Sequence, residues 1–308
     1  MRNGFFDLND GIFTGLGISS LNKSSEGRNA LLALFGGLEG LPSSVMKAKR
    51  SKPSIETDEH GATRSYRKTS PYSKESKEFG LSPIRGGGCQ AGALSIFPQD
   101  IGRSMVQFYS NPGDVVFDPF AGHNSRMELC VRAGRHYIGC DLSSSFMDFN
   151  DERAAQLRRE IPKALIELHR CDSRKIPVAD GAGDVTITSP PYWDIEFYGD
   201  EPEQLGKRKT YGGFLKGLLK ILKENFRVLK PGAYAAWFVN DFRRKGKMFF
   251  YHADLIRLGE EAGFAAHDIL IVDFGRGFGD VFVNRMMVRR IIPKRHEYGI
   301  IFRKPEKS

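Results

Sequence analysis

The sequence predicts an α/β fold in which an open, mostly parallel sheet carries helices on both faces. Short apolar segments with the composition of buried strands alternate along the chain with amphipathic segments of helical period. Several of the apolar segments end at an aspartate, and the first of them is joined to a helix by a glycine-containing loop. With 308 residues, 40% of them hydrophobic, the chain is long enough to bury the core of such a sheet.

The first predicted strand covers residues 114–117 and follows a turn at residues 111–113. It is apolar almost throughout, as the buried strands of parallel sheets are. The strand ends at Asp118, and a loop containing Gly122 leads into an amphipathic helix over residues 127–133. A strand, a tight loop and a helix start together form the nucleotide-binding corner of many open α/β sheets.

Polar side chains follow the next strands in the same way. Predicted strands over residues 136–140, 164–171 and 184–188 lead to Asp141, Asp172 and Ser189, respectively. Because the carboxyl ends of parallel strands meet at one edge, we expect Asp118, Asp141 and Asp172 to lie along that edge, with Asp141 placed to bind ribose hydroxyls. A single aspartate at such a position is more often a cap or a turn residue. Three in succession favour a binding site.

The fourth strand leads into Ser189-Pro190-Pro191-Tyr192. Two prolines fix φ and remove two N–H donors, so the segment presents only carbonyls, and Ser189 is held outside the α region by the proline that follows it. Tyr192 adds a large aromatic face. The segment is suited to hold a flat ring by one face and to offer acceptors to its exocyclic amine, although Ser-Pro-Pro is also ordinary turn chemistry.

The rest of the chain continues the alternation. An amphipathic helix is predicted over residues 211–229, a strand over 233–239, a helix over 248–262 and a strand over 264–274. The last segment, 297–303, is expected to insert antiparallel beside that strand. The expected sheet therefore has seven strands, six of them parallel and one reversed.

The first 95 residues have a different character. Residues 46–80 are rich in Lys, Arg, Ser and Glu and contain few aliphatic side chains, so they cannot bury enough apolar surface to order themselves. We expect a basic, partly disordered arm over residues 1–95 and a catalytic domain over residues 96–308. The arm is interpreted either as a solvated linker or as an element that follows nucleic acid.

Charge indicates a polyanionic partner. The net charge of +9 and the isoelectric point near 9.3 suit nucleic acid. Two clusters follow the fourth and fifth strands and are predicted to flank the same edge of the sheet as loops: Lys207, Arg208 and Lys209, then Arg243, Arg244 and Lys245. Such loops can clamp phosphates, which supplies affinity and not sequence choice. Alternatively, each is a solvated charged face.

The cysteines and the hydropathy pattern suggest a reducing compartment. Cys89, Cys130, Cys140 and Cys171 show no metal-ligand spacing and no small disulfide scaffold. We therefore expect no metal. The sequence has no cleavable leader pattern and no apolar run near the roughly 18 residues that a membrane span needs. A cytoplasmic location away from membranes is expected.

Two motifs resemble those of the DNA amino-methyltransferases that use S-adenosylmethionine. Asp118-Pro119-Phe120-Ala121-Gly122 is similar to their cofactor motif, and Thr188-Ser189-Pro190-Pro191-Tyr192-Trp193 is similar to their catalytic motif. Residues 97–110 resemble the helix that precedes the cofactor motif, and residues 293–304 resemble the closing strand. The resemblance covers residues 96–304. It implies a Rossmann-like methyltransferase fold, a cytoplasmic enzyme of a prokaryotic cell or its phage or mobile element, and DNA methylation of the kind found in restriction–modification systems.

One departure lies beside the cofactor motif. The family usually has Ser/Thr-Gly-Thr/Ser where this chain has His123-Asn124-Ser125. Asparagine tolerates a left-handed conformation better than most residues, so the turn is expected to survive. His123 is interpreted as a loop or cap residue, or as a contact to the cofactor carboxylate.

The resemblance implies roles for individual residues. Asp118 and Phe120 would lie beside the methionine portion of S-adenosylmethionine, Asp141 would bind the ribose and Asp172 would lie near the adenine amine. Gly122 would allow close approach of the backbone.

On the substrate side, the target base would be rotated out of the DNA duplex and would stack on Tyr192, with Trp193 or Phe197 walling the pocket. The Ser189 hydroxyl and the Pro190 carbonyl, fixed by Pro191, would accept the hydrogens of the amine while its nitrogen attacks the methyl group in line.

Serine at the first catalytic position favours the 4-amino group of cytosine over the 6-amino group of adenine, as a tendency of the family. None of the cysteines follows a proline, which argues against methylation at cytosine carbon 5. Alternatives are an RNA or protein-glutamine methyltransferase, or a DNA-binding relative that has lost catalysis. The target sequence and the oligomeric state are left open by the sequence.

Overall fold

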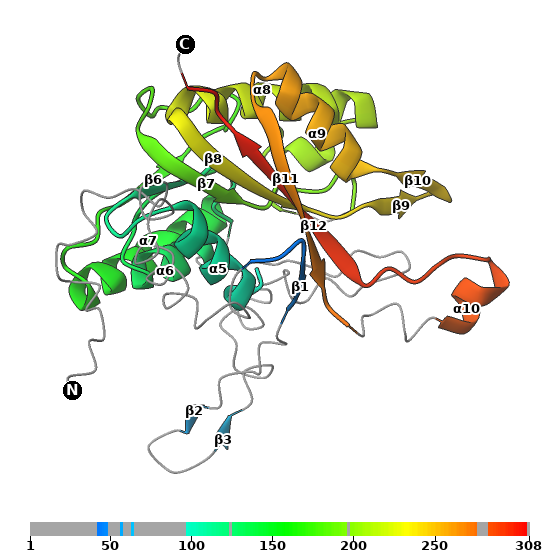
Figure 1. Cartoon of the computed structure of the whole chain (residues 1–308), viewed down its shortest axis with the longest axis horizontal. Coiled ribbons are helices and arrows are strands. Elements are labelled where there is room, and N and C mark those ends of the chain that lie inside the picture. The colour runs from blue at the N-terminus through cyan, green and yellow to red at the C-terminus, as the bar shows by residue number, and fades with distance from the viewer. Residues whose placement is uncertain are drawn as a thin grey trace, which may run out of the picture.

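The computed structural model describes residues 42–48, 56–57, 63–64, 97–122, 125–195, 198–275 and 283–306. A sheet of eight strands separates two layers of helices (Figure 1). The strands of this sheet are β1 (Val45–Lys47), β4 (Val115–Asp118), β5 (His136–Asp141), β6 (Ile166–Arg170), β7 (Gly183–Thr188), β8 (Leu229–Val239), β11 (Ala265–Asp273) and β12 (His296–Arg303). Two small antiparallel pairs are separate from it: β2 (Glu56–Thr57) with β3 (Thr63–Arg64), and β9 (Phe242–Arg244) with β10 (Lys247–Phe249).

The helices come between the strands, as the alternating pattern predicts. They are α5 (Gln99–Tyr109), α6 (Ser125–Arg132), α7 (Ser144–Glu160), α8 (Tyr211–Val228), α9 (Tyr251–Glu261) and α10 (Val283–Val288), with the 3₁₀ helix η2 (Leu205–Lys207). Within the described ranges, none of them combines the length and the apolar character needed to cross a bilayer.

The sheet confirms the predicted fold class. Neighbouring strands run β1-β11-β12-β8-β7-β4-β5-β6, and β12 is antiparallel to both β8 and β11 while the other pairs are parallel. The chain passes from β4 outward to β5 and β6, then returns to place β7 on the other side of β4. The strand order therefore reverses between β4 and β7, the switch point at which open α/β sheets bind their ligands.

The predicted number of strands is wrong by one, because β1 adds an eighth strand to the sheet. Seven strands were predicted, and the eighth comes from the region assigned to the N-terminal arm. Val45 pairs in parallel with Ile271, and the Ile271 amide donates to the Ser44 carbonyl at 2.7 Å. A strand of three residues in a polar region is too short to show a period of two, so the sequence pattern does not reveal it. The rest of residues 1–95 lies almost entirely outside the described ranges.

Alternating side chains of the central strand bury two separate faces. On β8, Ala236 and Phe238 join the core beneath α5, α6 and α7, whereas Ala235, Trp237 and Val239 join the core beneath α8 and α9. A strand with both faces buried reads as a continuous apolar run, which is why the sequence marks it so clearly. This double packing holds the carboxyl ends of the strands in fixed positions.

One predicted helix begins later than expected. The period over residues 248–262 predicts one continuous helix, but Met248 belongs to β10 and α9 begins at Tyr251. The predicted basic loop at residues 243–245 is correspondingly part of a β-hairpin. Its two turn residues, Lys245 and Gly246, have φ values of 49° and 80°, which closes the hairpin immediately before the helix.

Candidate active site

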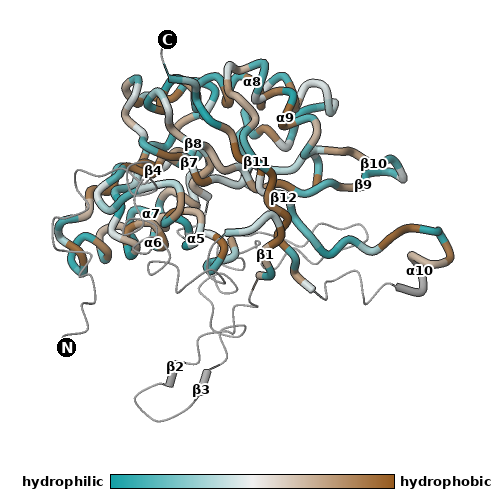
Figure 2. Tube along the Cα trace, in the orientation of Figure 1, coloured by the Kyte–Doolittle hydropathy of each residue, from teal (hydrophilic) through white to brown (hydrophobic). Residues whose placement is uncertain are grey.

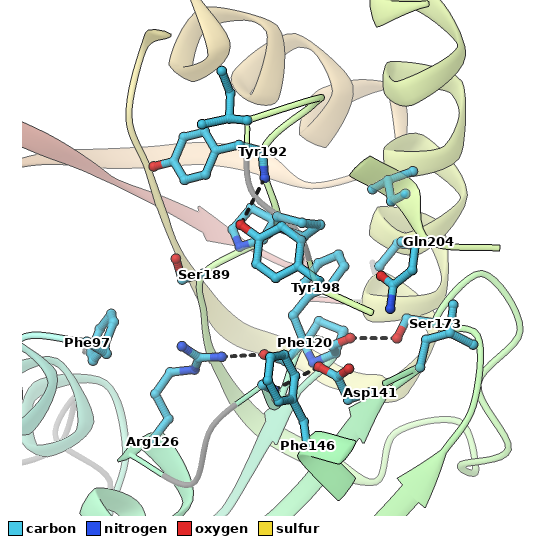
Figure 3. A pocket seen from close by; sticks show the side chains of 18 of the residues that line it. Phe97, Phe120, Arg126, Asp141, Phe146, Ser173, Ser189, Tyr192, Tyr198 and Gln204 are labelled. Carbon is cyan, nitrogen blue, oxygen red and sulfur yellow. Dashed lines mark hydrogen bonds between the residues drawn. The ribbon is translucent and has the colours of Figure 1, made fainter. Parts of the chain in front are cut away.

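A cavity of about 570 Å³ lies at the carboxyl ends of β4, β5, β7 and β8, at the switch point of the sheet (Figure 3). One end is lined by Gly122, Asp141, Phe146, Asp172 and Ser173, and the other by Ser189, Pro190, Pro191, Tyr192 and Tyr198. Phe120 lies between the two groups in this view. The cavity thus brings the two sequence motifs to opposite ends of one space.

Asp118 lies beneath the cavity and is fully buried. Its carboxylate accepts four hydrogen bonds, from Arg126 Nε at 2.6 Å, Thr188 Oγ1 at 2.6 Å, Tyr137 Oη at 2.9 Å and the Phe120 amide at 3.1 Å. It joins β4 to β5, β7 and α6, and it is not among the residues that line the cavity. Its acceptor capacity is used within the protein, which makes it a positioning residue for the loop above it.

Gly122 and Asp141 form the turn at the first end of the cavity. Gly122 has a φ of +49°, a backbone conformation that residues with a Cβ rarely adopt. Its amide donates to Asp141 Oδ2 at 2.8 Å. The Ser143 amide donates to Asp141 Oδ1 at 2.9 Å. Burial raises the pKa of Asp141 to about 6, although both amide hydrogen bonds act in the opposite direction. The carboxylate is thus held rigidly at the wall with a pKa close to neutral pH.

Asp172 and Ser173 complete the polar side of this end. Arg174 donates from Nε and Nη2 to the Asp172 carboxylate, at 2.8 Å and 2.5 Å. Burial opposes ionisation of Asp172, but the hydrogen bonds from Arg174 outweigh it and lower the pKa. The Ser173 hydroxyl donates to the Pro119 carbonyl at 2.5 Å and so ties this segment to the loop after β4. The ring of Phe146 faces the same space (Figure 3).

At the other end, the Ser189 hydroxyl donates its hydrogen to the Phe238 carbonyl at 3.2 Å. A hydroxyl has one hydrogen and two lone pairs, so the oxygen keeps acceptor capacity. The Pro191 carbonyl is occupied by the Tyr251 hydroxyl at 3.3 Å. Among the described residues, no donor contacts the Pro190 carbonyl. Two acceptors, on Ser189 and Pro190, therefore belong to the same wall of the cavity.

Aromatic side chains hold Tyr192. Its ring meets Phe242 and Tyr251 edge-on, with centroids 5.9 Å and 5.8 Å apart, and its amide donates to the Tyr198 hydroxyl at 3.4 Å. Edge-to-face contacts of this kind restrain a ring without covering both of its faces. Tyr192 is half-buried and lines the cavity.

Trp193 has a different place from the predicted one. Its indole N–H donates to the Arg208 carbonyl at 2.7 Å, and its ring packs against Tyr211 and Phe249. It does not line the cavity. The neighbouring aromatic residue that does is Tyr198, whereas Phe197, like His123 and Asn124, lies outside the described residues.

The two basic clusters follow β7 and β8, as predicted. Lys207 approaches Asp200 at 3.8 Å, and Arg208 donates to the Glu203 carbonyl at 3.3 Å. Lys209 is exposed. Arg244 forms an ion pair with Asp194 at 2.7 Å, whereas Arg243 and Lys245 are exposed on the hairpin. None of these six side chains lines the cavity.

Several residues that line the cavity were not predicted from the sequence. Asn240 and Asp241 lie at the carboxyl end of β8, as Asp118 and Asp141 lie at the carboxyl ends of β4 and β5, so the pattern of polar residues at strand ends indicates them. Asp241 is buried and accepts from His252 Nδ1 at 2.7 Å, and the buried Oδ1 of Asn240 has no partner among the described residues. No sequence signal marks Phe146 or Tyr198. The described side chains include no group of three His, Cys, Asp or Glu residues arranged to hold a metal ion.

The cavity lies at the point where the strand order reverses, which is where Rossmann-like folds bind nucleotide-type ligands. The family can be assigned more specifically than the fold class. The chain belongs to the DNA methylase family, whose sequence pattern matches residues 41–152 and 184–308. This match confirms the resemblance drawn from the two motifs.

Curated relatives match over short segments. The orphan methyltransferase M.BamHII of Bacillus amyloliquefaciens is 36% identical over 59 residues, which is 19% of this chain and 22% of the relative. The DNA adenine methyltransferase YhdJ of Escherichia coli is 34% identical over 50 residues, 16% of this chain and 17% of that protein. The chain therefore spans only about a fifth of the length of the curated relatives it matches.

Solved structures with related folds are more distant in sequence. A SAM-dependent methyltransferase from Methanosarcina mazei is 17% identical with a TM-score of 0.45, over 70% of this chain and 100% of the other. TrmN from Thermus thermophilus is 16% identical with a TM-score of 0.45, over 74% of this chain and 53% of the other.

Proposed function

We propose that the protein transfers a methyl group from S-adenosylmethionine to an exocyclic amino group of a DNA base. The observation that carries the proposal is the pair of acceptors on Ser189 and Pro190, which share one cavity with Asp141 and Gly122. An amino group that donates hydrogen bonds to Ser189 and Pro190 and a nucleotide-type cofactor can thus meet in a single cavity. Family membership supports DNA as the substrate.

The first end of the cavity fits the cofactor. Gly122 allows the backbone to approach closely, Asp141 and Asp172 offer carboxylates to hydroxyl and amino groups, and Phe146 offers an apolar face. When bound, S-adenosylmethionine supplies the electrophilic methyl group. Asp118 supports the site from below by holding Phe120 and Arg126 in place.

At the substrate end, Tyr192 stacks on the base that has left the helix, at an unstacking cost of a few kcal/mol. Ser189 Oγ and the Pro190 carbonyl accept the hydrogens of the amine. They lie where positive charge develops on the nitrogen as its bond to the methyl carbon forms, and preorganised dipoles stabilise such charge. The carbon–sulfur bond of the cofactor would break as the new bond forms, leaving a thioether, and one hydrogen of the amine would leave to solvent as a proton. Tyr251 fixes the Pro191 carbonyl, so the wall does not have to reorganise during the reaction.

Cytosine N4 is the favoured position, because the catalytic segment begins with serine. Adenine N6 is the alternative, and the printed name of the relative YhdJ specifies adenine. The remaining alternatives are an RNA or protein-glutamine methyltransferase and a catalytically inactive DNA-binding protein. The labelling and cofactor-binding experiments below distinguish each of them from a DNA methyltransferase.

Cofactor affinity is expected to fall in mild acid. Burial raises the pKa of Asp141 to about 6, and the protonated carboxyl loses acceptor capacity toward ribose hydroxyls. Below about pH 6, the dissociation constant of S-adenosylmethionine should therefore rise about tenfold per pH unit. Calorimetric titration from about pH 5 to about pH 7.5 checks this. Asp141→Asn should bind weakly with little dependence on pH; a wild-type affinity that stays constant over the range would contradict the assignment.

The reaction is tested by transfer of labelled methyl groups from S-adenosylmethionine to unmodified genomic DNA, with digestion to nucleosides and separation by mass. We expect 4-methylcytosine as the product. A 6-methyladenine peak would show that the target base is adenine and not cytosine. Label found only on RNA or protein would overturn the proposal that DNA is the substrate.

Tyr192→Ala is the control for this assay. Stacking on an aromatic side chain contributes about 1–3 kcal/mol per base, so product formation should fall by about 5- to 150-fold. Binding of S-adenosylmethionine, measured by thermal shift, should not change. A wild-type protein with neither product nor cofactor binding would be the inactive DNA-binding relative.

A further inference from the structure

The β9–β10 hairpin projects from the body of the protein immediately after the cavity wall (Figure 1). Asn240, Asp241 and Phe242 line the cavity, and Phe242 is also the first residue of β9. The strands pair in the register Arg244 with Lys247 and Phe242 with Phe249. Positive φ at both turn residues is the signature of a type I′ turn, whose twist matches that of the two strands. The hairpin is thus a formed element and not a loose charged loop.

The root of the hairpin is packed against the catalytic segment. Phe242 and Phe249 stack with centroids 5.2 Å apart, Phe242 meets Tyr192 at 5.9 Å, and Phe249 meets Trp193 at 5.4 Å. Arg244 reaches back to Asp194, the residue after Trp193, at 2.7 Å. The hairpin and the segment that carries Tyr192 are therefore joined by ring contacts and an ion pair.

The tip of the hairpin carries cations. Arg243, Lys245 and Lys247 are exposed, and no carboxylate in the described part of the chain lies within ion-pair distance of them. Figure 2 shows this segment as hydrophilic. The cluster after β7 differs, since Lys207 lies near Asp200. The positive charge of the hairpin is therefore available to a partner.

The guanidinium of Arg243 is held near the turn, where Nη1 donates to the Gly246 carbonyl at 3.4 Å. Arginine presents a planar fork of donors that suits the edge of guanine, whereas lysine acts as a flexible point charge toward phosphates. The Nζ of Lys247 instead lies over the ring of Phe249, 5.3 Å from its centroid. The residues of the tip thus differ in chemical role.

We propose that the β9–β10 hairpin enters the major groove of duplex DNA beside the target nucleotide, with Arg243 reading a base edge and Lys245 and Lys247 contacting phosphates. The major groove, about 12 Å wide, admits a two-stranded β-ribbon. Because the root packs on Tyr192 and Trp193, insertion of the hairpin places the base pocket over the adjacent nucleotide. The inference rests on the proposed function only in taking duplex DNA as the substrate.

Measurements of DNA affinity and of the sequences that are methylated distinguish the role of Arg243 from that of the two lysines at the tip. Anisotropy titrations of a short mixed-sequence duplex over a range of salt concentrations give the salt dependence of binding. The Lys245→Gln/Lys247→Gln variant should lower the slope of log K against log salt by about 1 per lysine and weaken binding to all sequences alike. The Arg243→Gln variant should instead broaden the set of sequences methylated in genomic DNA, read by sequencing of the modified bases.

The Lys216→Gln/Lys220→Gln variant, with the same charge change on exposed residues of α8, is the matched control and should show the wild-type slope. Thermal shift with S-adenosylmethionine verifies that each variant is folded. Unchanged slope and unchanged sequence choice in both hairpin variants of an active enzyme would overturn the proposal. A hairpin-dependent slope in a protein that methylates no DNA would support the hairpin contact and overturn the proposed function instead.

Discussion

Replacing Ser189 by alanine is expected to lower the rate constant for methyl transfer by about 100- to 1,000-fold, the range measured when one preorganised dipole is removed from a reacting centre. The Ser189 hydroxyl donates its one hydrogen to the Phe238 carbonyl, so its lone pairs remain available to accept a hydrogen bond. In the proposed reaction, alanine removes one of the two acceptors that face the substrate amine. The cofactor end does not contact this hydroxyl, so the dissociation constant of S-adenosylmethionine should remain unchanged.

Ser173→Ala is the matched control for this prediction. Ser173 lines the same cavity, but its hydroxyl donates to the Pro119 carbonyl at the other end. Its loss should weaken cofactor binding with little change in the rate at saturating cofactor. Single-turnover rates and calorimetric titrations separate the two effects. Equal losses of rate in both variants, or weaker cofactor binding in Ser189→Ala, would show that Ser189 does not act on the substrate amine.

The strands and their ends were predictable because burial and chain direction constrain them together. Buried parallel strands read as apolar runs, and the topology brings their carboxyl ends to one edge. Asp141, Asp172 and Ser189 line the same cavity for that reason. Asn240 follows the same rule at the carboxyl end of β8.

Side-chain directions at the rim were not predictable in this way. Trp193 follows Tyr192 directly, yet its indole N–H points to the Arg208 carbonyl while Tyr192 faces the cavity. A partly buried indole needs an acceptor for its N–H, and only the folded loop supplies one. Tyr198 reaches the cavity from the same loop without any sequence signal.

The β9–β10 hairpin shows two patterns in competition. Lys245-Gly246 between two short segments that carry Phe242 and Phe249 is a hairpin signal. Met248 and Phe249, which follow the turn, continue the helical period of α9 toward the N-terminus, and this favoured a helix that begins at residue 248. The hairpin prevails because Met248 and Phe249 pair with Arg243 and Phe242 of β9, and the turn at Lys245 and Gly246 sets that register.

Asp118 shows how a motif residue can contact the residues of a site without lining it. The sequence places it with Asp141 and Asp172 at the ends of strands, but only the structure shows that Thr188, Arg126 and Tyr137 use its acceptor capacity. Thr188 immediately precedes Ser189. The buried carboxylate therefore links the loop after β4 to the start of the catalytic segment, so its loss should affect both ends of the cavity.

Asp118→Ala is accordingly expected to lower the free energy of unfolding by about 3–5 kcal/mol, the usual cost of breaking a buried ion pair by removing one partner. The variant leaves the Arg126 guanidinium buried with only backbone acceptors, and it leaves the hydroxyls of Thr188 and Tyr137 without their acceptor. Urea denaturation measures the change. Because Asp118 and Arg126 act as a unit, Asp118→Ala/Arg126→Met should recover part of the stability.

The exposed Arg257–Glu261 pair, 3.6 Å apart, provides the control for that measurement. Arg257→Met should change stability by less than about 1 kcal/mol, since water and salt already screen an exposed pair. If Asp118→Ala unfolded at the same urea concentration as Arg257→Met, its hydrogen bonds would not hold the two loops together. A large loss of stability with partial recovery in the double variant would show that the family motif begins with a residue that organises the site from beneath.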